Sequence, residues 1–345
     1  MGKKPVLPEL KGIGGKAKNK TKQWTFIDLF AGIGGFHLGL KSLGVKCVFI
    51  NEFDSRAKET YLNYFQKKDL ELFNSRLTDY FWKDIKDITL SDTNKTEKEK
   101  TENIKKVIPE YDILCAGFPC QSFSLVGQKN GFDDDRGTLF NDIYLIIKAT
   151  EPRVVFLENV RNIVRHNNGG VLNYIIKKLK RVGYEVELEK GHNWKILRAS
   201  DFGLPTYRPR FYLVAFRKDV VGSENFKFPE PSTPKGVALN DFFHRGWPSR
   251  IGKTIRVGGS GSPVYKKPDG SWFIDRRSWD TYIIRGKKHL LTVDEAKKMM
   301  GFPEDFEFPE GLSEFQKMRQ LGNSVAVPVI KAIAQEIIKV LETNG

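Results

Sequence analysis

Residues 26–35 have the sequence FIDLFAGIGG, and this stretch decides the fold class. An apolar run ends in a glycine-rich turn, and residues 35–43 are then expected to form a helix. Glycines between a strand and a helix let the backbone approach a ligand closely. The spacing is G-x-G-G rather than G-x-G-x-x-G, so it does not favour a pyrophosphate group. The stretch predicts a strand, a turn and a helix beside a nucleotide-like ligand.

Strands and helices are expected to alternate along most of the chain. This alternation predicts an α/β fold, a doubly wound and mostly parallel sheet with helices on both faces. Residues 84–85 are expected to end a weak strand or turn, and the polar residues 91–106 to form an exposed insertion. The expected strands cover 25–30, 46–51, 111–116, 153–158, part of 184–198, and 211–217; the expected helices lie near 35–43, 54–66, 138–150, 170–181, 292–300 and 325–342.

Candidate ligand contacts follow the first strands. Glu52 ends the second strand about 20 residues after the turn, where a carboxylate can accept hydrogen bonds from ribose hydroxyls. Phe30 and Phe53 can stack on a purine ring, and Asp84 can accept from an adenine amino group. The alternative is an ordinary tight turn with solvated acids. Because acids end both following strands, we favour a nucleoside-bearing cofactor.

Cys120 is the candidate nucleophile. It lies in the tetrad PCQS, residues 119–122, after the apolar strand 111–116. A thiol in a loop at a strand's carboxyl end suits covalent catalysis. A buried, inert cysteine is the alternative, and Cys115 inside the strand fits that description better. The chain has three cysteines and no C-x-x-C pair, which argues against a disulfide framework and a thiolate zinc site.

The positive charge is concentrated in two segments. The net charge is +15, of which residues 1–24 contribute +6 and residues 217–288 contribute +8. A generally basic surface is one explanation, but clustered Lys and Arg favour a polyanionic partner. Residues 1–22 are expected to be a disordered basic tail or an artificial extension. No 18-residue apolar run occurs, so we expect no membrane span and a cytoplasmic location.

Five motifs in a fixed order resemble those of the DNA cytosine-5 methyltransferases, which use S-adenosylmethionine. They are DLFAGIGG at 28–35, GFPCQSFS at 117–124, ENV at 158–160, RPRFY at 208–212 and QLGNSV at 320–325. The resemblance implies a Rossmann-like, S-adenosylmethionine-dependent catalytic domain over 23–216 and 289–345. It also implies a smaller β and loop target-recognition domain over 217–288, with a DNA cleft between the two.

The resemblance also assigns roles to individual residues. Cys120 would attack carbon 6 of a flipped-out cytosine, Glu158 would contact the ring nitrogen and amino group, and Arg208 and Arg210 would hold the base's carbonyl oxygen and position the catalytic groups. The implied cofactor contacts, for S-adenosylmethionine and its product S-adenosylhomocysteine, are Phe30, Ala31, Gly32, Ile33, Gly34, Gly35, Glu52, Phe53, Asp84, Ile85, Pro119, Asn323 and Ser324. A helix N-cap is the alternative role for the last two.

DNA contacts are expected from both parts of the chain. Residues 253–261, KTIRVGGSG, resemble the stretch that organises the family's recognition domain. Arginine is the commonest reader of guanine, although most arginines touch phosphate. The candidate DNA-binding residues are Gln121, Ser124, Arg136 and Arg256.

The resemblance therefore predicts a bacterial restriction-modification enzyme that methylates double-stranded DNA. It is expected to be a monomer without a metal, located at the nucleoid and paired in function with a restriction endonuclease. Two alternatives remain. The related RNA-acting branch methylates tRNA, but its later Cys-Phe-Thr signature is missing because no cysteine follows Cys120. A catalytically inactive DNA-binding homologue is disfavoured by the intact Cys120, Glu158 and paired arginines.

Overall fold

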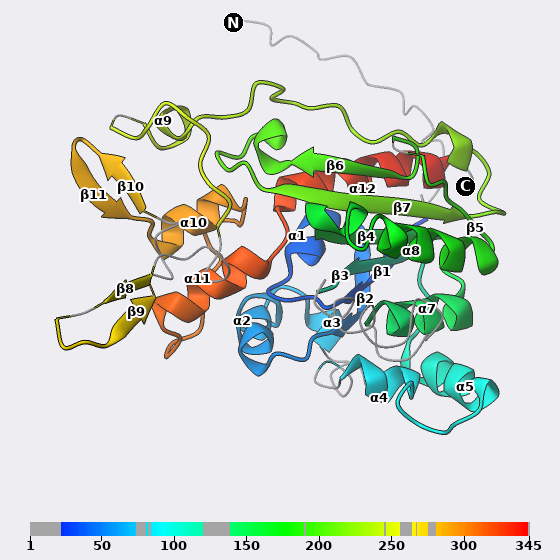
Figure 1. Ribbon diagram of the computed structural model, residues 1–345. Coiled ribbons are helices and arrows are strands. Elements are labelled where there is room, and N and C mark those ends of the chain that lie inside the picture. Colours follow the sequence, from blue (N-terminus) through cyan, green and yellow to red (C-terminus); the bar gives the residue numbers. More distant parts are fainter. Residues whose placement is uncertain are drawn as a thin grey trace, which may run out of the picture.

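The computed structural model describes residues 22–73, 81, 84–119, 139–189, 191–244, 246–255, 264–266, 268–274 and 281–343. Within them a central sheet is covered by helices, and two β-hairpins lie at the far end of the molecule (Figure 1). The elements in chain order are β1 Thr25–Leu29, α1 Gly35–Lys41, β2 Lys46–Asn51, α2 Ser55–Phe65, α3 Leu70–Phe73, α4 Ile85–Thr89, α5 Glu97–Val107, β3 Ile113–Gly117, α7 Leu139–Thr150, β4 Val154–Val160, η2 Arg161–Val164, α8 Gly170–Arg181, β5 Tyr184–Glu185, β6 Trp194–Arg198, η3 Ala199–Phe202, β7 Pro209–Arg217, η4 Ser223–Asn225, α9 Leu239–Phe243, β8 Val264–Lys266, β9 Trp272–Ile274, β10 Thr281–Ile284, β11 Lys287–Leu290, α10 Val293–Met299, α11 Glu314–Asn323 and α12 Val327–Glu342.

The central sheet has seven strands in the order β2-β1-β3-β4-β7-β5, with β6 also paired to β7. Strands β2, β1, β3 and β4 are parallel, whereas β7 is antiparallel to β4, β5 and β6. Six strands therefore run in one direction and β7 in the other. The expected mostly parallel sheet is confirmed, with one reversed strand.

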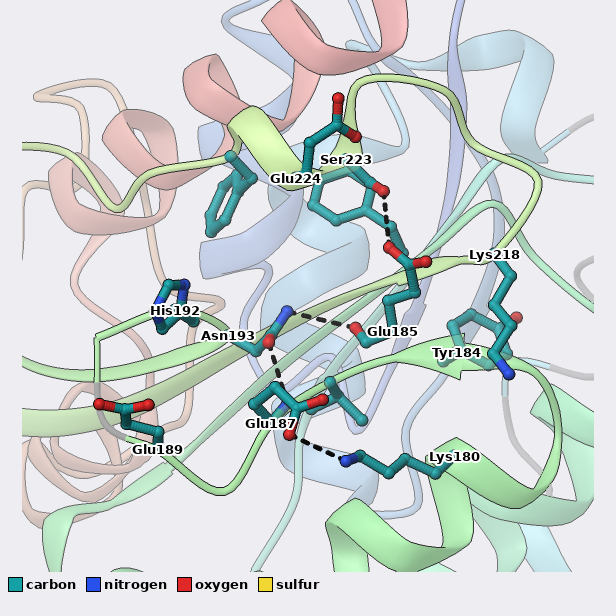
Figure 2. Close-up of a pocket in the computed structure, with 13 residues that line it drawn as sticks. Lys180, Tyr184, Glu185, Glu187, Glu189, His192, Asn193, Lys218, Ser223 and Glu224 are labelled. Atoms are coloured by element: carbon teal, nitrogen blue, oxygen red, sulfur yellow. Dashed lines mark hydrogen bonds and ion pairs between the residues drawn. The ribbon is translucent and has the colours of Figure 1, made fainter.

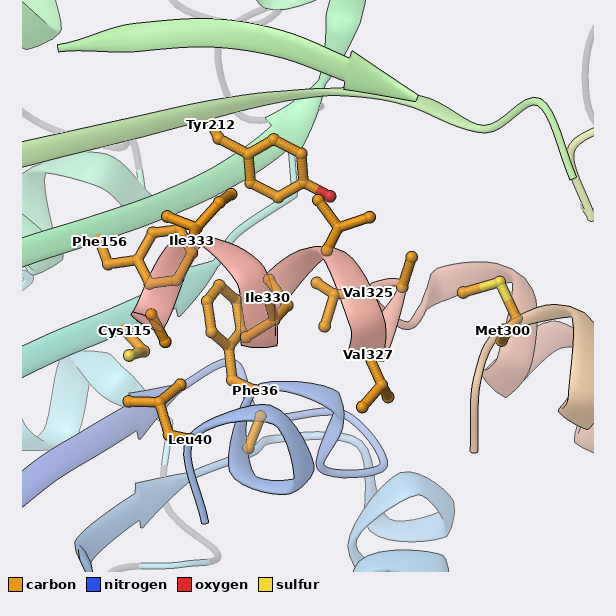
Figure 3. Close-up of a cluster of buried hydrophobic side chains, with 14 of the residues drawn as sticks. Phe36, Leu40, Cys115, Phe156, Tyr212, Met300, Val325, Val327, Ile330 and Ile333 are labelled. Atoms are coloured by element: carbon orange, nitrogen blue, oxygen red, sulfur yellow. The ribbon is translucent and has the colours of Figure 1, made fainter. Parts of the chain in front are cut away.

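Alternate residues of the strands face two separate hydrophobic cores, because side chains alternate across a sheet. Phe26, Cys115 and Phe156 pack with α1, α2 and α12 on one face. Figure 3 shows this layer, where Ile330 and Ile333 of α12 lie beside Phe36 of α1 and Phe156 of β4, whose ring centroids are 5.1 Å apart. Ile27 and Leu157 pack with α4, α5, α7 and α8 on the other face. The sheet is doubly wound, as predicted.

The segment from 218 onward first packs against the same side of the sheet as α1 and α12. Phe226, Phe228 and Leu239 belong to the same buried cluster as α1 and α12. The hairpins β8–β9 and β10–β11 follow, both antiparallel. Tyr282 of β10 also reaches the main core. A recognition unit confined to 217–288 remains a prediction.

One expectation about local structure was wrong, and another was incomplete. Asp84 does not end a strand: it is the N-cap of α4, and its side chain accepts a hydrogen bond from the Lys86 amide at 3.1 Å. Residues 91–106 are largely exposed, as expected, but they include a helix that was not expected: α5 covers 97–107 and begins with a capping box between Thr96 and Glu99. Ile104 and Val107 bury its inner side. None of the described helices has the length and apolarity needed to cross a membrane.

Candidate active site

The candidate residues converge on one edge of the sheet. Strands β1 to β4 are parallel, so their carboxyl ends lie together, and β7 starts at the same edge because it is antiparallel to β4. Ligands of open α/β sheets bind at this edge. The glycine turn follows β1, Glu52 follows β2, Phe118 follows β3, and Glu158 lies near the end of β4.

The glycine turn is held in an uncommon conformation. Phe30 has φ = 57°, although it is not glycine, and Gly32 and Gly34 also have positive φ. Such strain in a non-glycine residue is concentrated at functional sites. A Cβ on Gly32 would have no atom within 4 Å, so the backbone is open to a ligand there.

Gly35 joins this turn to the C-terminal motif. A Cβ on Gly35 would lie 2.6 Å from Val325 Cγ2 and 2.9 Å from Ser324 Oγ. Glycine is therefore needed where α1 begins, and the turn and residues 324–325 touch although the sequence separates them widely. Asn323 is exposed at the last position of α11, and Ser324 is its C-cap. The alternative of an N-cap is wrong for both, because Ala326 has that position in α12.

Glu52 fastens the turn to β2. Its Oε2 accepts a hydrogen bond from the Gly32 amide at 2.7 Å, and its Oε1 accepts from the Asp54 amide at 2.7 Å. Burial raises the pKa of Glu52, while these backbone amides oppose the shift. Phe53 follows directly with 73% of its surface exposed. The turn thus places an open backbone, a carboxylate and an uncovered aromatic ring together.

Glu158 is a buried acid with one arginine partner at salt-bridge distance. Its side chain is paired with Arg210, whose Nε lies 3.2 Å from Glu158 Oε1. Burial raises the pKa of Glu158, and the positive charges of Arg210 and Arg208 act against that rise. A Cβ on Gly117 would lie 3.7 Å from Glu158 Oε2, so the end of β3 passes close to this acid.

Arg208 is 2% exposed and holds the C-terminal motif. Its Nη2 donates to the Gly322 carbonyl at 3.0 Å and to the Ser324 carbonyl. Burial, with the nearby charge of Arg210, lowers the pKa of Arg208 to about 9. Its Nε and Nη1 are buried without a hydrogen-bond partner among the described residues, so donor capacity remains for a ligand.

The proposed nucleophile itself lies outside the described residues. Cys120, Gln121, Ser124, Arg136 and Arg256 all belong to undescribed stretches. The segment that leads to Cys120 is described up to Pro119. Asn159 Nδ2 donates to the Phe118 carbonyl at 2.8 Å, so the end of β4 braces the chain two residues before Cys120.

Comparison with known proteins identifies the family. The model of the C-5 cytosine-specific DNA methylases matches residues 24–255 and 252–339. The chain belongs to this family. It is a DNA cytosine-5 methyltransferase.

Individual relatives are similar in sequence to this chain over most of their length. The Type II methyltransferase M.HhaI of Haemophilus parahaemolyticus is 33% identical, over 92% of this chain and 96% of the relative. The Type II methyltransferase M.MspI of a Moraxella species is 34% identical, over 98% of this chain and 76% of the relative. A solved structure of a putative DNA modification methyltransferase from an E. coli prophage has a TM-score of 0.61 and 21% identity, covering 92% of this chain and 99% of that one, and so shows the same fold.

Asp28 is a buried acid of β1 that the motif contained but sequence reasoning did not single out. Both of its carboxylate oxygens are buried without a hydrogen-bond partner among the described residues. Burial raises the pKa of Asp28 well above its usual range, and Glu52 adds to the shift. A lone acid inside the apolar strand of this methyltransferase was the available signal. It lies directly beneath the glycine turn.

A hollow on the described surface lies apart from this site. It has a volume of about 590 Å³ and lies against β5, near the end of β7 opposite to Arg210. Figure 2 shows that its polar groups bond to each other: Lys180 pairs with Glu187 at 2.9 Å, and Ser223 Oγ donates to Glu185 at 3.0 Å. These contacts stabilise the sheet edge. No cluster of three potential metal ligands occurs within the described part of the chain.

Proposed function

We propose that this methyltransferase takes a methyl group from S-adenosylmethionine and places it on carbon 5 of a cytosine flipped out of duplex DNA. The observation that carries the proposal is the buried pair of Glu158 and Arg210 at 3.2 Å, beside the strand end that leads to Cys120. Carbon 5 is inaccessible inside a duplex, and methyltransferases that act on bases extrude them.

The residues around the glycine turn fit the cofactor. Glu52 would accept from the ribose, Phe53 would cover the purine, and the backbone at Gly32 is open for the amino acid portion. Phe30, Ala31, Ile33, Gly34, Asp84, Ile85, Pro119, Asn323 and Ser324 are proposed as the remaining contacts. When bound, S-adenosylmethionine supplies an electrophilic methyl group, and S-adenosylhomocysteine is the product.

Cys120 is proposed as the nucleophile. Its thiolate would bond to carbon 6 of cytosine, which makes carbon 5 an enamine carbon able to take the methyl group. A water molecule then takes the proton from carbon 5, the bond between sulfur and carbon 6 breaks, the thiolate returns, and the ring nitrogen gives its proton back to Glu158. A raised pKa lets Glu158 carry the proton that the ring nitrogen needs while the thiolate adds.

The two arginines are proposed to have different roles: one positions Glu158, and the other binds the base. Arg210 holds Glu158 through the ion pair. Arg208 retains two buried donors without a described partner, Nε and Nη1, and these suit the carbonyl oxygen of the extruded base. An unpaired buried donor costs free energy, so a ligand that fills it binds more tightly.

The same proposal covers the partners. Gln121, Ser124, Arg136 and Arg256 would contact DNA, with a recognition domain over 217–288 and the catalytic domain over 23–216 and 289–345. The matched relatives are named Type II methyltransferases, which supports protection of host DNA alongside a cognate restriction endonuclease. The enzyme would act as a monomer at the bacterial nucleoid in the cytoplasm.

The test is covalent trapping with a duplex that carries 5-fluorocytosine. Fluorine cannot leave as a cation, so the adduct should persist and migrate as a protein–DNA complex in a denaturing gel. Cys120→Ser should abolish the adduct and turnover but keep DNA binding. Cys115→Ala is the matched control, since Cys115 is buried and burial raises its pKa well above the usual range. An adduct that survives Cys120→Ser would overturn the assignment, and bisulfite sequencing would report the methylated base.

A further inference from the structure

Arg198 lies at the same edge of the sheet as the active site, one strand beyond Arg210. Strand β6 pairs with β7, with Leu197 opposite Arg210 and Arg198 opposite Pro209. Arg210 in turn binds Glu158 on β4, the other neighbour of β7. Adjacent strands are about 4.8 Å apart, and Arg198 pairs with Pro209 whereas Glu158 pairs with Tyr212, three residues farther along β7. The backbones of Arg198 and Glu158 therefore lie roughly 14 Å apart, counting about 3.3 Å per residue along the strand.

The guanidinium of Arg198 is held in place by two neighbours. Its Nε lies 2.9 Å from Oδ2 of Asp201, a carboxylate that is itself buried. Its Cζ lies 5.7 Å from the centre of the Tyr207 ring, within the range of a cation–π interaction. The Arg198 side chain nevertheless remains 41% exposed. Most exposed arginines lack such fixed supports, and fixing one lowers the entropy lost on binding.

Tyr207 is itself fixed and exposed. Its amide donates to the Gly252 carbonyl at 2.9 Å, and it directly precedes the buried Arg208. Its ring is 41% exposed, which places a large uncovered aromatic surface at the edge of the site. Arg161 and Arg165, which follow β4 at this edge, are exposed as well and add positive charge.

We infer that Arg198, braced by Asp201 and supported by Tyr207, binds a backbone phosphate of the DNA strand that carries the target cytosine. The inference rests on the proposed function, because it presumes a duplex at this edge. The ion pair with Asp201 uses Nε, which leaves the two Nη groups for the phosphate, and Arg binds phosphate through a planar fork. At about 3.4 Å of rise per nucleotide, a separation of roughly 14 Å corresponds to a phosphate about four nucleotides from the target.

The test compares DNA affinity across salt concentrations. Arg198→Ala should weaken binding about tenfold at low salt and reduce the slope of log K against log salt by about 0.9. Arg198→Lys should restore the slope but only part of the affinity, because lysine keeps the charge without the fork. Tyr207→Ala should weaken binding and Tyr207→Phe should not, since the ring supplies the support.

Arg181→Ala is the matched control. It removes the same charge from an exposed arginine at the end of α8, just before β5 at the opposite edge of the sheet. This variant should keep the wild-type slope. KM for DNA should rise in Arg198→Ala while kcat at saturating DNA stays within about twofold, because the residue does not touch the reacting atoms.

The outcomes separate this inference from the proposed function. A slope in Arg198→Ala equal to the wild-type slope, or a slope reduced equally in Arg181→Ala, would overturn the phosphate contact while wild-type methylation stood. Absence of cytosine methylation by the wild-type enzyme would instead reject the proposed function. The melting temperature and the affinity for S-adenosylmethionine report whether the variant is folded, and both should match the wild type in Arg198→Ala. If both fall together with DNA affinity, Arg198 has a structural role and the phosphate contact is overturned.

Discussion

At the scale of single residues, the ionisation of Glu158 is set by competing effects of burial and charge. Burial favours the neutral acid, and Arg210 and Arg208 favour the carboxylate. A buried carboxyl group with a raised pKa holds a proton more readily than an exposed one, which suits a general acid. The glutamate and its arginine therefore work as one unit.

Glu158→Gln tests that unit. Glutamine keeps the shape and one oxygen for Arg210 but cannot transfer a proton, so kcat should fall about 10²- to 10⁴-fold. DNA binding should change little. Single-turnover methylation and a gel-shift assay measure the two quantities. If Glu158→Gln kept the kcat of the wild-type enzyme, this carboxyl group would carry no proton during the reaction.

A second residue-scale feature is the buried His37 of α1. Its Nε2 lies 3.0 Å from Asp69 Oδ2, and its Nδ1 contacts the Tyr61 hydroxyl. A neutral ring satisfies both contacts, donating from Nε2 and accepting at Nδ1. Burial lowers the pKa of His37, against the opposing effect of Asp69.

This shift predicts a pH dependence of stability. The folded pKa lies below the usual 6.5, so the unfolded chain binds more protons there, and the free energy of unfolding should fall as pH drops below 6.5. The slope is at most about 1.4 kcal/mol per pH unit. Urea unfolding at pH 7.5 and 5.5 should show a smaller loss for His37→Phe than for the wild type. Asp28 and Glu52, whose pKa values are raised, have the opposite sign but are common to both proteins. Equal losses would mean that His37 does not titrate in this window.

At the scale of elements, the position of α1 depends on two close approaches. A Cβ on Gly35 would meet Val325 at 2.6 Å, and a Cβ on Gly39 would meet Ile330 Cγ2 at 2.7 Å. Both contacts press α1 against α12 or the residues just before it. Only the approach at Gly35 lies at the glycine turn proposed to bind the cofactor. Comparing substitutions at Gly35 and Gly39 therefore distinguishes an effect on helix packing from an effect on ligand binding.

Gly35→Ala and Gly39→Ala should therefore differ in one measurement. Overpacking costs about 1–3 kcal/mol in each, and both should lower Tm. S-adenosylmethionine affinity, measured by calorimetry, should fall only in Gly35→Ala, because the added methyl group displaces residues 324–325. A comparable loss of affinity in Gly39→Ala would show that the turn responds to helix packing in general.

Elements with strong apolar periodicity were predictable, and polar ones were not. Strands β1 and β2 and helices α2 and α8 begin and end within one residue of the expected bounds, because buried apolar runs define them. Helix α5 was missed because its sequence, EKEKTENIKKV, has only two buried residues and is stabilised mainly by its capping box. Asp84 was misassigned because an acid can end a strand or cap a helix, and sequence alone does not choose.

At the scale of the whole molecule, the motifs predicted which residues meet, but not how they contact one another. Gly35 and Ser324 were each assigned to the cofactor, yet the close approach of Gly35 to residues 324–325 depends on the packing of α1 against the start of α12. The contact of Arg208 with the carbonyls of residues 322 and 324 likewise depends on the fold. Arg198 belonged to no motif, and its support by Asp201 and Tyr207 follows from η3 and the start of β7, which local sequence does not reveal.

The distribution of charge over the molecule leads to the last prediction. The net charge of +15 is concentrated in residues 1–24 and 217–288, and the catalytic edge adds Arg161, Arg165 and Arg198. If six to ten of these cations reach phosphates, DNA affinity should fall about 10³- to 10⁵-fold between 50 and 200 mM salt. S-adenosylmethionine affinity should change far less, because buried and backbone contacts are screened little. Fluorescence anisotropy over a salt series measures the first and calorimetry the second. A flat DNA response would mean that shape and base contacts, not clustered charge, bring the duplex to this enzyme.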